Sequence, residues 1–302
     1  MPCYSPLDGW LSKDRNPSGK RSIVFTKSEA LVDRPVKLPC GRCIGCRLEK
    51  SRQWAVRMMH EASLYEENCF ITLTYEKMPP NDSLNKKHFQ DFMKRLRKAY
   101  GGRTIRYFHC GEYGENFGRP HYHAILFNLD FNDKKYWSIV NGNKYYTSEK
   151  LNKIWGKGYC IIGSVSFDSA AYVARYVTKK ITGEAAFEHY TDFDRETGEI
   201  TRERDPEYAT MSRRPGIGSV WLDKFKTDVY PNDFVIVNGV KTKPPKFYDG
   251  QLEKFDSDLH QELKNQRIAN GNKAIGDNNL NRLRTKETVK KAALGFLKER
   301  IK

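Results

Sequence analysis

Two histidines separated by one residue form a possible metal-binding pair. His121 and His123 flank Tyr122 in an alternating stretch, 121–127 (HYHAILF), that is typical of a β-strand. Because side chains alternate between the faces of a strand, both imidazoles project from one face and Tyr122 from the other. Two such imidazoles can chelate a metal ion. The same pattern also fits two structural histidines that bind nothing.

A carboxylate lies nearby in the sequence. The strand predicted at 104–110 (TIRYFHC) runs into Glu112 and Glu115, and a short loop then leads to the histidine strand. If the two strands pair, either glutamate could supply an oxygen ligand. Two imidazoles and one carboxylate leave coordination positions open for a substrate oxygen. Ordinary solvated loop carboxylates are the alternative.

Two tyrosines form the third group. Tyr172 and Tyr176 lie one turn apart in a helix predicted over 169–181, and Lys179 and Lys180 follow one turn later. A phenolic oxygen can attack phosphorus to give a phosphotyrosine, and a nearby lysine can offset the developing charge. Tyrosines at this spacing also stabilise helices by packing alone.

Alternating strands and helices must position these groups. The predicted elements are strand 70–75, helix 83–100 with Ser83 as its cap, strands 104–110 and 121–127, helix 148–155, strand 159–165 and helix 169–181. Strands joined by a short loop are antiparallel, so we expect an α+β fold with helices packed on one face of an antiparallel sheet. Residues 1–39 are predicted to be extended chain and loop, and 47–66 a helix. Residues 252–302 are predicted to form two charged helical stretches.

Charge narrows the class of partner. The 302 residues include 53 Lys and Arg against 37 Asp and Glu, a net charge of +16, which favours a nucleic acid. The chain has no long apolar run and no signal pattern, so we expect a soluble, intracellular protein without a membrane partner. The densest basic run is 86–106. The predicted DNA-contacting residues are Lys94, Arg97, Lys98, Arg103, Arg106 and Arg119.

Seven cysteines in a chain without a secretory signal indicate free thiols or metal ligands. Three of them have the spacing of a metal site, with a fourth upstream: Cys40, Cys43 and Cys46, with Cys3. A structural zinc site is the first interpretation, with unligated thiols or an iron–sulfur cluster as alternatives. Three more are expected to be small buried residues of strands: Cys69, Cys110 and Cys160.

As an ordered set, these motifs resemble a known family. The segments are 39–47 (PCGRCIGCR), 111–114 (GEYG), 119–123 (RPHYH) and 172–179 (YVARYVTK). The set resembles the HUH endonuclease superfamily of rolling-circle replication initiators, and most closely those of small single-stranded DNA phages of the gokushovirus type. The resemblance covers roughly residues 1–220.

The resemblance implies a fold and roles for single residues. It implies a ferredoxin-like or RRM-like HUH endonuclease domain at 67–220, a cysteine-rich N-terminal extension at 1–66 and a mostly helical C-terminal extension at 221–302. His121 and His123 would be metal ligands, with Glu112 preferred to Glu115 as the third. Tyr176 with Lys179 fits the nucleophile motif best. Tyr172 would be a second nucleophile, and Lys180 is an alternative to Lys179.

The implied activity is nicking and joining of DNA. With Mg or Mn bound, a tyrosine would attack single-stranded DNA at a viral origin, leaving a 3'-hydroxyl and a 5'-phosphotyrosine. A host polymerase and helicase would be partners in the host bacterial cytoplasm. No P-loop motif is present, so a built-in helicase is not expected. A noncatalytic single-stranded nucleic-acid binding protein and an HUH transposase or relaxase are the alternative functions.

Overall fold

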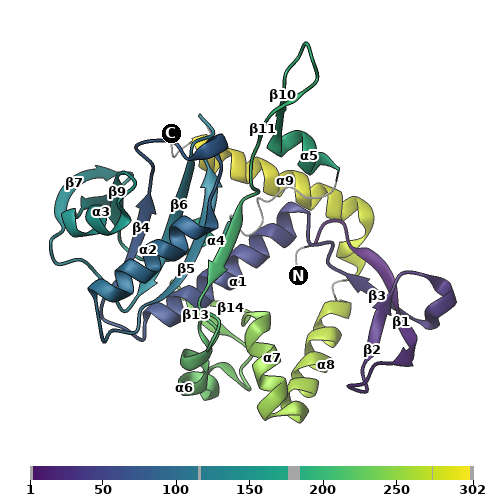
Figure 1. The fold of residues 1–302 in the computed structure, drawn as a ribbon. Coiled ribbons are helices and arrows are strands. Elements are labelled where there is room, and N and C mark those ends of the chain that lie inside the picture. Colours follow the sequence, from purple (N-terminus) through teal and green to yellow (C-terminus); the bar gives the residue numbers. More distant parts are fainter. Residues whose placement is uncertain (1–2, 115–116, 176–183, 274, 300–302) are drawn as a thin grey trace. The chain divides into compact units, whose positions relative to one another are not determined.

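Two compact units make up the protein, for which a computed structural model describes residues 3–114, 117–175, 184–273 and 275–299. Residues 1–50 and 264–302 form one unit, called here the terminal unit, and residues 51–263 form the central unit. Figure 1 shows the elements of both along the chain. The domain boundaries after residues 66 and 220 stay predictions.

The central unit is built on an antiparallel sheet. Among the described residues it has seven strands, and each neighbouring pair is antiparallel. In spatial order they are β12 (Tyr208–Met211), β5 (Arg106–Tyr113), β6 (Pro120–Phe127), β4 (Asn68–Leu73), β9 (Cys160–Gly163), β8 (Asn143–Thr147) and β7 (Lys135–Val140). The expected α+β class with an antiparallel sheet is confirmed.

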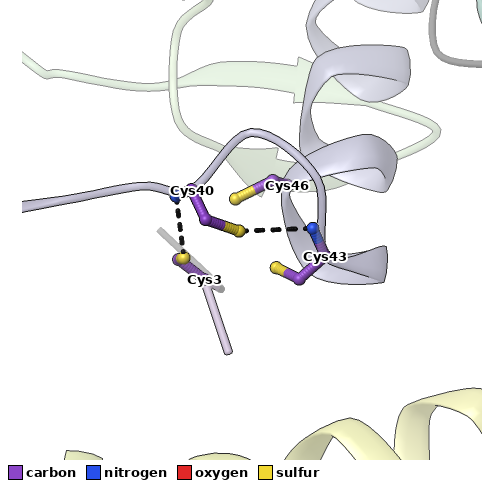
Figure 2. A group of neighbouring side chains, drawn as sticks. All are labelled: Cys3, Cys40, Cys43 and Cys46. Carbon is purple, nitrogen blue, oxygen red and sulfur yellow. Dashed lines mark hydrogen bonds between the residues drawn. The ribbon is translucent and has the colours of Figure 1, made fainter. Parts of the chain in front are cut away.

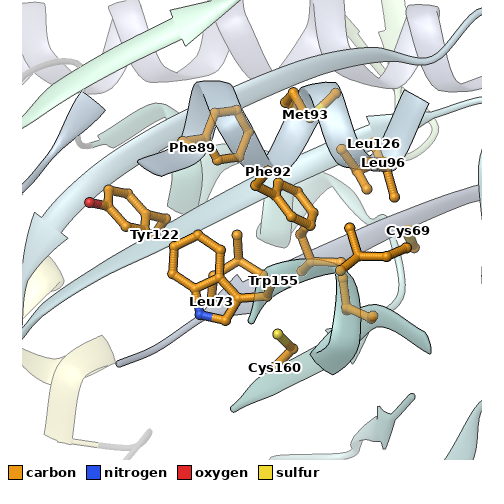
Figure 3. Packing of buried hydrophobic residues seen from close by; sticks show 14 of the residues in the cluster. Cys69, Leu73, Phe89, Phe92, Met93, Leu96, Tyr122, Leu126, Trp155 and Cys160 are labelled. Atoms are coloured by element: carbon orange, nitrogen blue, oxygen red, sulfur yellow. The ribbon is translucent and has the colours of Figure 1, made fainter. Parts of the chain in front are cut away.

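Helices cover both faces of this sheet, and the prediction of helices on one face alone is wrong. Helices α2 (Lys86–Ala99) and α3 (Glu149–Trp155) pack on one face, as Figure 3 shows for Phe89, Phe92 and Trp155. Helix α4 (Phe167–Arg175) and the part of α1 (Ile44–Ala62) after residue 50 pack on the other. The physical reason is that strand β6 has buried side chains of both parities, so both of its faces need a cover.

Helix α2 follows its sequence pattern closely. Its buried residues are the predicted apolar stripe: Phe89, Phe92, Met93 and Leu96. Its N-cap is Asn85 and not Ser83, because the Asn85 side chain accepts a hydrogen bond from the Lys87 main-chain N–H at 2.9 Å.

Residues 7–38 differ from the expected extended chain and loop, because their extended segments pair with one another. They form a sheet in the order β2-β1-β3, with β1 (Leu7–Arg15), β2 (Arg21–Val24) and β3 (Ala30–Leu38), and a short 3-10 turn at Lys27–Glu29. The hairpin β7–β8 was also not predicted. Most residues of these strands are exposed, so they lack the regular apolar alternation by which strands are recognised.

The later part of the chain is mostly helical. It contains α5 (Ala185–Tyr190), β10 (Thr191–Phe193), β11 (Ile200–Glu203), α6 (Ser219–Val229), β13 (Val235–Val237), β14 (Val240–Thr242), α7 (Lys246–Phe255), α8 (Ser257–Lys273) and α9 (Leu280–Glu299). Further 3-10 turns lie at Pro80–Asp82 and Ile275–Asn278. The two helical stretches predicted in 252–302 are confirmed as α8 and α9. In the described part of the chain, no helix has both the length and the apolar character to cross a membrane.

Candidate active site

Strand register brings a carboxylate and two imidazoles together. In the pairing of β5 with β6, Glu112 stands opposite His121 and Cys110 opposite His123. The Nε2 atoms of His121 and His123 each lie 2.8 Å from the same oxygen, Oε1 of Glu112. One ligand atom from each residue lies within 4.8 Å of the others, as in a three-ligand metal site. We call these three residues the His–Glu cluster.

Neighbouring groups orient both imidazoles through their other ring nitrogen. The Nδ1 of His121 lies 3.0 Å from the Arg119 carbonyl oxygen, which accepts the hydrogen bond. The Nδ1 of His123 lies 2.9 Å from the Thr72 hydroxyl on β4. Partners of this kind fix a ligand's tautomer and ring position. Sequence reasoning missed Thr72, because only the β4–β6 register places it opposite His123.

Tyr172 reaches the His–Glu cluster from helix α4. Its hydroxyl donates a hydrogen bond to Oε1 of Glu112 at 3.2 Å, and its ring lies edge-on to the His123 ring with centroids 5.1 Å apart. The ring is about one third exposed, whereas Glu112 is buried. The phenol therefore stands between the cluster and solvent, where it can meet a substrate.

Glu112 is held as a carboxylate. Burial by itself would raise the pKa of Glu112, but hydrogen bonds from His121 and His123 outweigh it and lower the pKa to about 2. A carboxylate with so low a pKa is a poor proton acceptor near neutral pH. It suits the role of a permanently charged ligand better than that of a general base.

Four predicted residues lie outside the described part of the chain: Glu115, Tyr176, Lys179 and Lys180. The choice of Tyr176 over Tyr172 as the safer nucleophile, and of Lys179 over Lys180, therefore stays a prediction. The structure places Glu112 beside His121 and His123, and the choice of Glu112 over Glu115 as metal ligand stays a prediction.

The basic face of helix α2 lies away from the His–Glu cluster. Lys94, Arg97 and Lys98 are exposed on α2, which packs on the sheet face that carries Tyr122. His121 and His123 project from the opposite face, by the alternation along β6. These three cations and the cluster are thus separated by the thickness of the sheet and a helix.

Two other predicted DNA contacts are already paired. Arg106 is buried: its Nε donates to Glu61 Oε1 at 2.5 Å and its Nη2 to the Pro215 carbonyl at 2.9 Å. Arg103 makes a half-exposed ion pair with Glu67. Burial argues against a phosphate contact by Arg106, and we leave it out of the proposed contacts.

A basic cavity nevertheless gathers several of these side chains. It has a volume of about 610 Å³ and is lined by Arg97, Arg103, Arg106, Arg213 and Arg214, among others. It lies at the start of β5, whereas Glu112 lies six residues further along the strand, about 20 Å away. Arg213 and Arg214 were not predicted, since only the pairing of β12 with β5 brings them here.

Arg119 occupies a different place, directly before the histidine strand. Its side chain donates to the Tyr75 carbonyl at 3.0 Å, while its own carbonyl accepts from His121. Both groups act within the protein. The residue holds the start of β6 beside the end of β4.

The predicted cysteine cluster forms within the terminal unit. One sulfur from each of Cys3, Cys40, Cys43 and Cys46 lies within 4.8 Å of the others, and Figure 2 shows the four side chains converging at the start of α1. Main-chain N–H groups of Cys40, Cys43 and Tyr4 each donate to a cluster sulfur at 3.3 Å. The remaining three are buried in strands, as expected: Cys69, Cys110 and Cys160.

The chain is similar in sequence to replication-associated proteins of phages. A family model described as "Replication-associated protein ORF2/G2P" matches residues 68–181. Replication-associated protein VP4 of Bdellovibrio phage phiMH2K is 32% identical over 247 residues, which cover 76% of this chain and 74% of that protein. This chain belongs to the phage replication-associated protein family. The predicted relationship to phage replication initiators is confirmed.

Other phage replication-associated proteins are similar over comparable lengths. ORF2 of Spiroplasma virus 4 is 34% identical over 72% of this chain and 68% of its own length. ORF4 of Chlamydia phage 1 is 27% identical over 77% of this chain and 59% of its own length. No solved structure is significantly similar to this chain. The family match at 68–181 spans the whole His–Glu cluster and Tyr172.

Proposed function

We propose that this phage replication-associated protein is a metal-dependent endonuclease of the HUH type. It would nick single-stranded DNA at a viral origin and later rejoin the strand. The observation that carries the proposal is the convergence of His121, His123 and Tyr172 on one oxygen of Glu112. Membership of a phage replication family supports a role in replication over transposition or plasmid transfer. The central strands β5, β6, β4 and β9, with both histidines on β6, support an HUH-type core.

The residues of the His–Glu cluster fit a divalent ion. Their donor set of two imidazole nitrogens and a carboxylate oxygen suits Mn²⁺, and Mg²⁺ with added water ligands. When bound, the ion would neutralise charge on the scissile phosphate and align it for in-line attack. Thr72 and the Arg119 carbonyl keep both Nε2 atoms pointed at that position.

Tyr172 is the nucleophile we assign first. Its oxygen would form a bond to phosphorus as the bond from phosphorus to the 3'-oxygen breaks. The phenolic proton leaves and the 3'-oxygen takes up a proton, so the products are a 5'-phosphotyrosine and a 3'-hydroxyl. The phosphodiester energy is kept in the new bond, and rejoining needs no ATP. Tyr176 with Lys179, the pair that the sequence favours as nucleophile and cation, lies outside the described residues and stays a prediction.

The cysteine cluster supports a second, structural metal site. Burial raises the pKa of Cys46, and the neighbouring thiols of Cys3 and Cys43 raise it further, because a second thiolate beside Cys3 would be repelled. Cys3, Cys40, Cys43 and Cys46 would hold a Zn²⁺ ion that offsets this repulsion, and an all-cysteine ligand set is typical of closed structural zinc sites. Such an ion would tie the chain before β1 to the first turn of α1.

Covalent capture tests the nuclease proposal. A labelled single strand containing the phage origin is incubated with the protein and Mn²⁺, and a denaturing gel is examined for a labelled protein band. We expect a band with the wild-type protein and none with His121→Ala combined with His123→Ala. Tyr172→Phe should abolish or strongly reduce the band, with Tyr159→Phe as the matched control for an exposed tyrosine. If Tyr172→Phe combined with Tyr176→Phe still yields wild-type cutting, the tyrosine mechanism is wrong.

A further inference from the structure

Most of the protein's positive charge lies in the terminal unit, whereas the His–Glu cluster belongs to the central unit. Residues 1–50 and 264–302 hold 21 basic and 8 acidic side chains, a net charge of +13 out of +16. The central unit holds the remaining 32 basic and 29 acidic side chains, a net charge of only +3. The proposed nuclease chemistry therefore does not account for the excess of positive charge.

A cavity in the terminal unit collects part of this charge. It has a volume of about 1010 Å³ and lies between residues 3–39 and helix α9 with the turn before it. Four cations line it: Lys37, Arg282, Lys286 and Lys290. The last three are spaced four residues apart on α9, so they form a row along one helix face with steps of about 6 Å.

The acidic partners of these cations are exposed and weakly bound. Lys37 pairs with Asp8 at 2.7 Å, while Asp277 pairs with both Arg282 at 2.9 Å and Lys286 at 2.6 Å. Exposed ion pairs of this kind contribute little stability, so a phosphate group can replace the carboxylate at small cost. The row of Arg282, Lys286 and Lys290 therefore keeps a net positive charge when the carboxylate of Asp277 is included.

Apolar side chains line the same cavity. Leu38, Pro39 and Ala293 contribute to its wall, and Ile275 and Val289 leave about two thirds of their surface exposed. A duplex keeps its base faces stacked inside and offers such a surface phosphates and the base edges of its grooves. An unpaired strand offers phosphates to the cations and base faces to the apolar wall, where Tyr4 supplies an aromatic ring on which a base can stack.

We propose that this cavity is a second, noncatalytic binding site for single-stranded DNA. It would hold the strand independently of the His–Glu cluster, so it goes beyond the proposed nicking activity. The cysteine cluster adjoins it, since Cys3 and Tyr4 also line the cavity.

Binding of a fluorescent 30-nucleotide oligothymidine, followed by anisotropy without added divalent ions, tests the proposal in the full chain. The test variant changes Lys37, Arg282, Lys286 and Lys290 to glutamine. The matched control changes four exposed cations of the same unit that do not line the cavity, which are Lys13, Lys27, Arg34 and Lys264. Both variants lose the same charge, so a general electrostatic effect would weaken them equally.

We expect the test variant to bind at least tenfold more weakly at 0.15 M salt and the control to stay within threefold of wild type. The slope of log affinity against log salt should fall by about 3 in the test variant, from roughly 0.7 per lost contact on a single strand. Equal losses in both variants would overturn the proposal. A duplex competitor that displaces the oligonucleotide as well as an unlabelled single strand would overturn the choice of ligand.

Two further measurements separate folding and nicking from binding. Crosslinking of wild-type protein to 4-thiothymidine DNA should map to peptides within 37–39 or 275–293, and crosslinks confined to 51–263 would refute the site even if a variant misfolds. Covalent capture with Mn²⁺ reports cutting and needs a tyrosine nucleophile, whereas anisotropy without divalent ions reports binding alone, so the two readouts can fail separately. Failure of covalent capture would thus leave this proposal standing, and failure of this proposal would leave the nuclease standing.

Discussion

Replacing His60 by glutamine should flatten the pH dependence of the free energy of unfolding. His60 is buried on α1, stacks on Trp221 with ring centroids 3.5 Å apart, and its Nδ1 lies 2.8 Å from the Tyr248 hydroxyl. Burial lowers the pKa of His60 from its ordinary 6.5 to about 4. Below pH 6.5 the His60 side chain therefore binds a proton in the unfolded chain but stays neutral in the folded protein.

The difference between the pKa of His60 in the folded protein and in the unfolded chain sets the sign and size of the change in the free energy of unfolding. The stability contributed by neutral His60 is complete above pH 6.5 and is lost as the pH falls from 6.5 towards 4. At pH 5 the loss relative to pH 7 amounts to about 2 kcal/mol, and it approaches about 3 kcal/mol near pH 4. The glutamine variant has no such proton to take up, so it should lose less stability on acidification by that amount.

Urea titrations followed by tryptophan fluorescence at pH 7, 6 and 5 measure the effect. Wild-type protein is compared with His60→Gln and with His189→Gln, whose histidine is exposed. Any constant cost of the substitution cancels, because only the change between pH values is compared. If wild type and His60→Gln lose the same stability between pH 7 and pH 5, the assigned burial effect is wrong.

Other outcomes follow from the same structure. Thr72→Val should weaken Mn²⁺ binding at the His–Glu cluster by 10 to 100-fold, as calorimetric titration would show, with Thr72→Ser restoring it because the hydroxyl returns. Glu61→Ala should lower the free energy of unfolding by about 3 to 5 kcal/mol, since it leaves Arg106 buried without its partner; Glu61→Leu combined with Arg106→Met should cost much less in the same urea assay. Cys46→Ser should reduce bound zinc from one per chain towards zero by elemental analysis, whereas Cys160→Ala should not, and equal zinc in both would exclude the cysteine site.

Local patterns predicted the parts of the fold that bury a regular apolar face. Phe89, Phe92 and Leu96 recur at helical spacing, and α2 was predicted on that basis. The alternation around Tyr122 placed both histidines on one face, which the structure confirms. Each of these inferences needs only residues that are neighbours in the sequence.

Contacts between side chains that meet only through the pairing of distant strands could not be predicted from the sequence. The contact of Thr72 with His123 requires the β4–β6 register, and the basic cavity with Arg213 requires β12 to pair with β5. The sequence showed a basic run at 86–106 but not that its helix lies on the sheet face opposite His123. Likewise, the concentration of charge in the terminal unit became visible only when two remote segments were found together.

The union of these two segments also sets an order of folding during synthesis. The central unit is complete once residue 263 has been made, but residues 264–302 need about 2 to 8 seconds more at a translation rate of about 5 to 20 residues per second. All four cysteines of the cluster lie within the first 46 residues, so the proposed metal site would be complete in sequence long before α9 is made. A metal-bound N-terminal segment would then serve as the template on which the late basic helix docks.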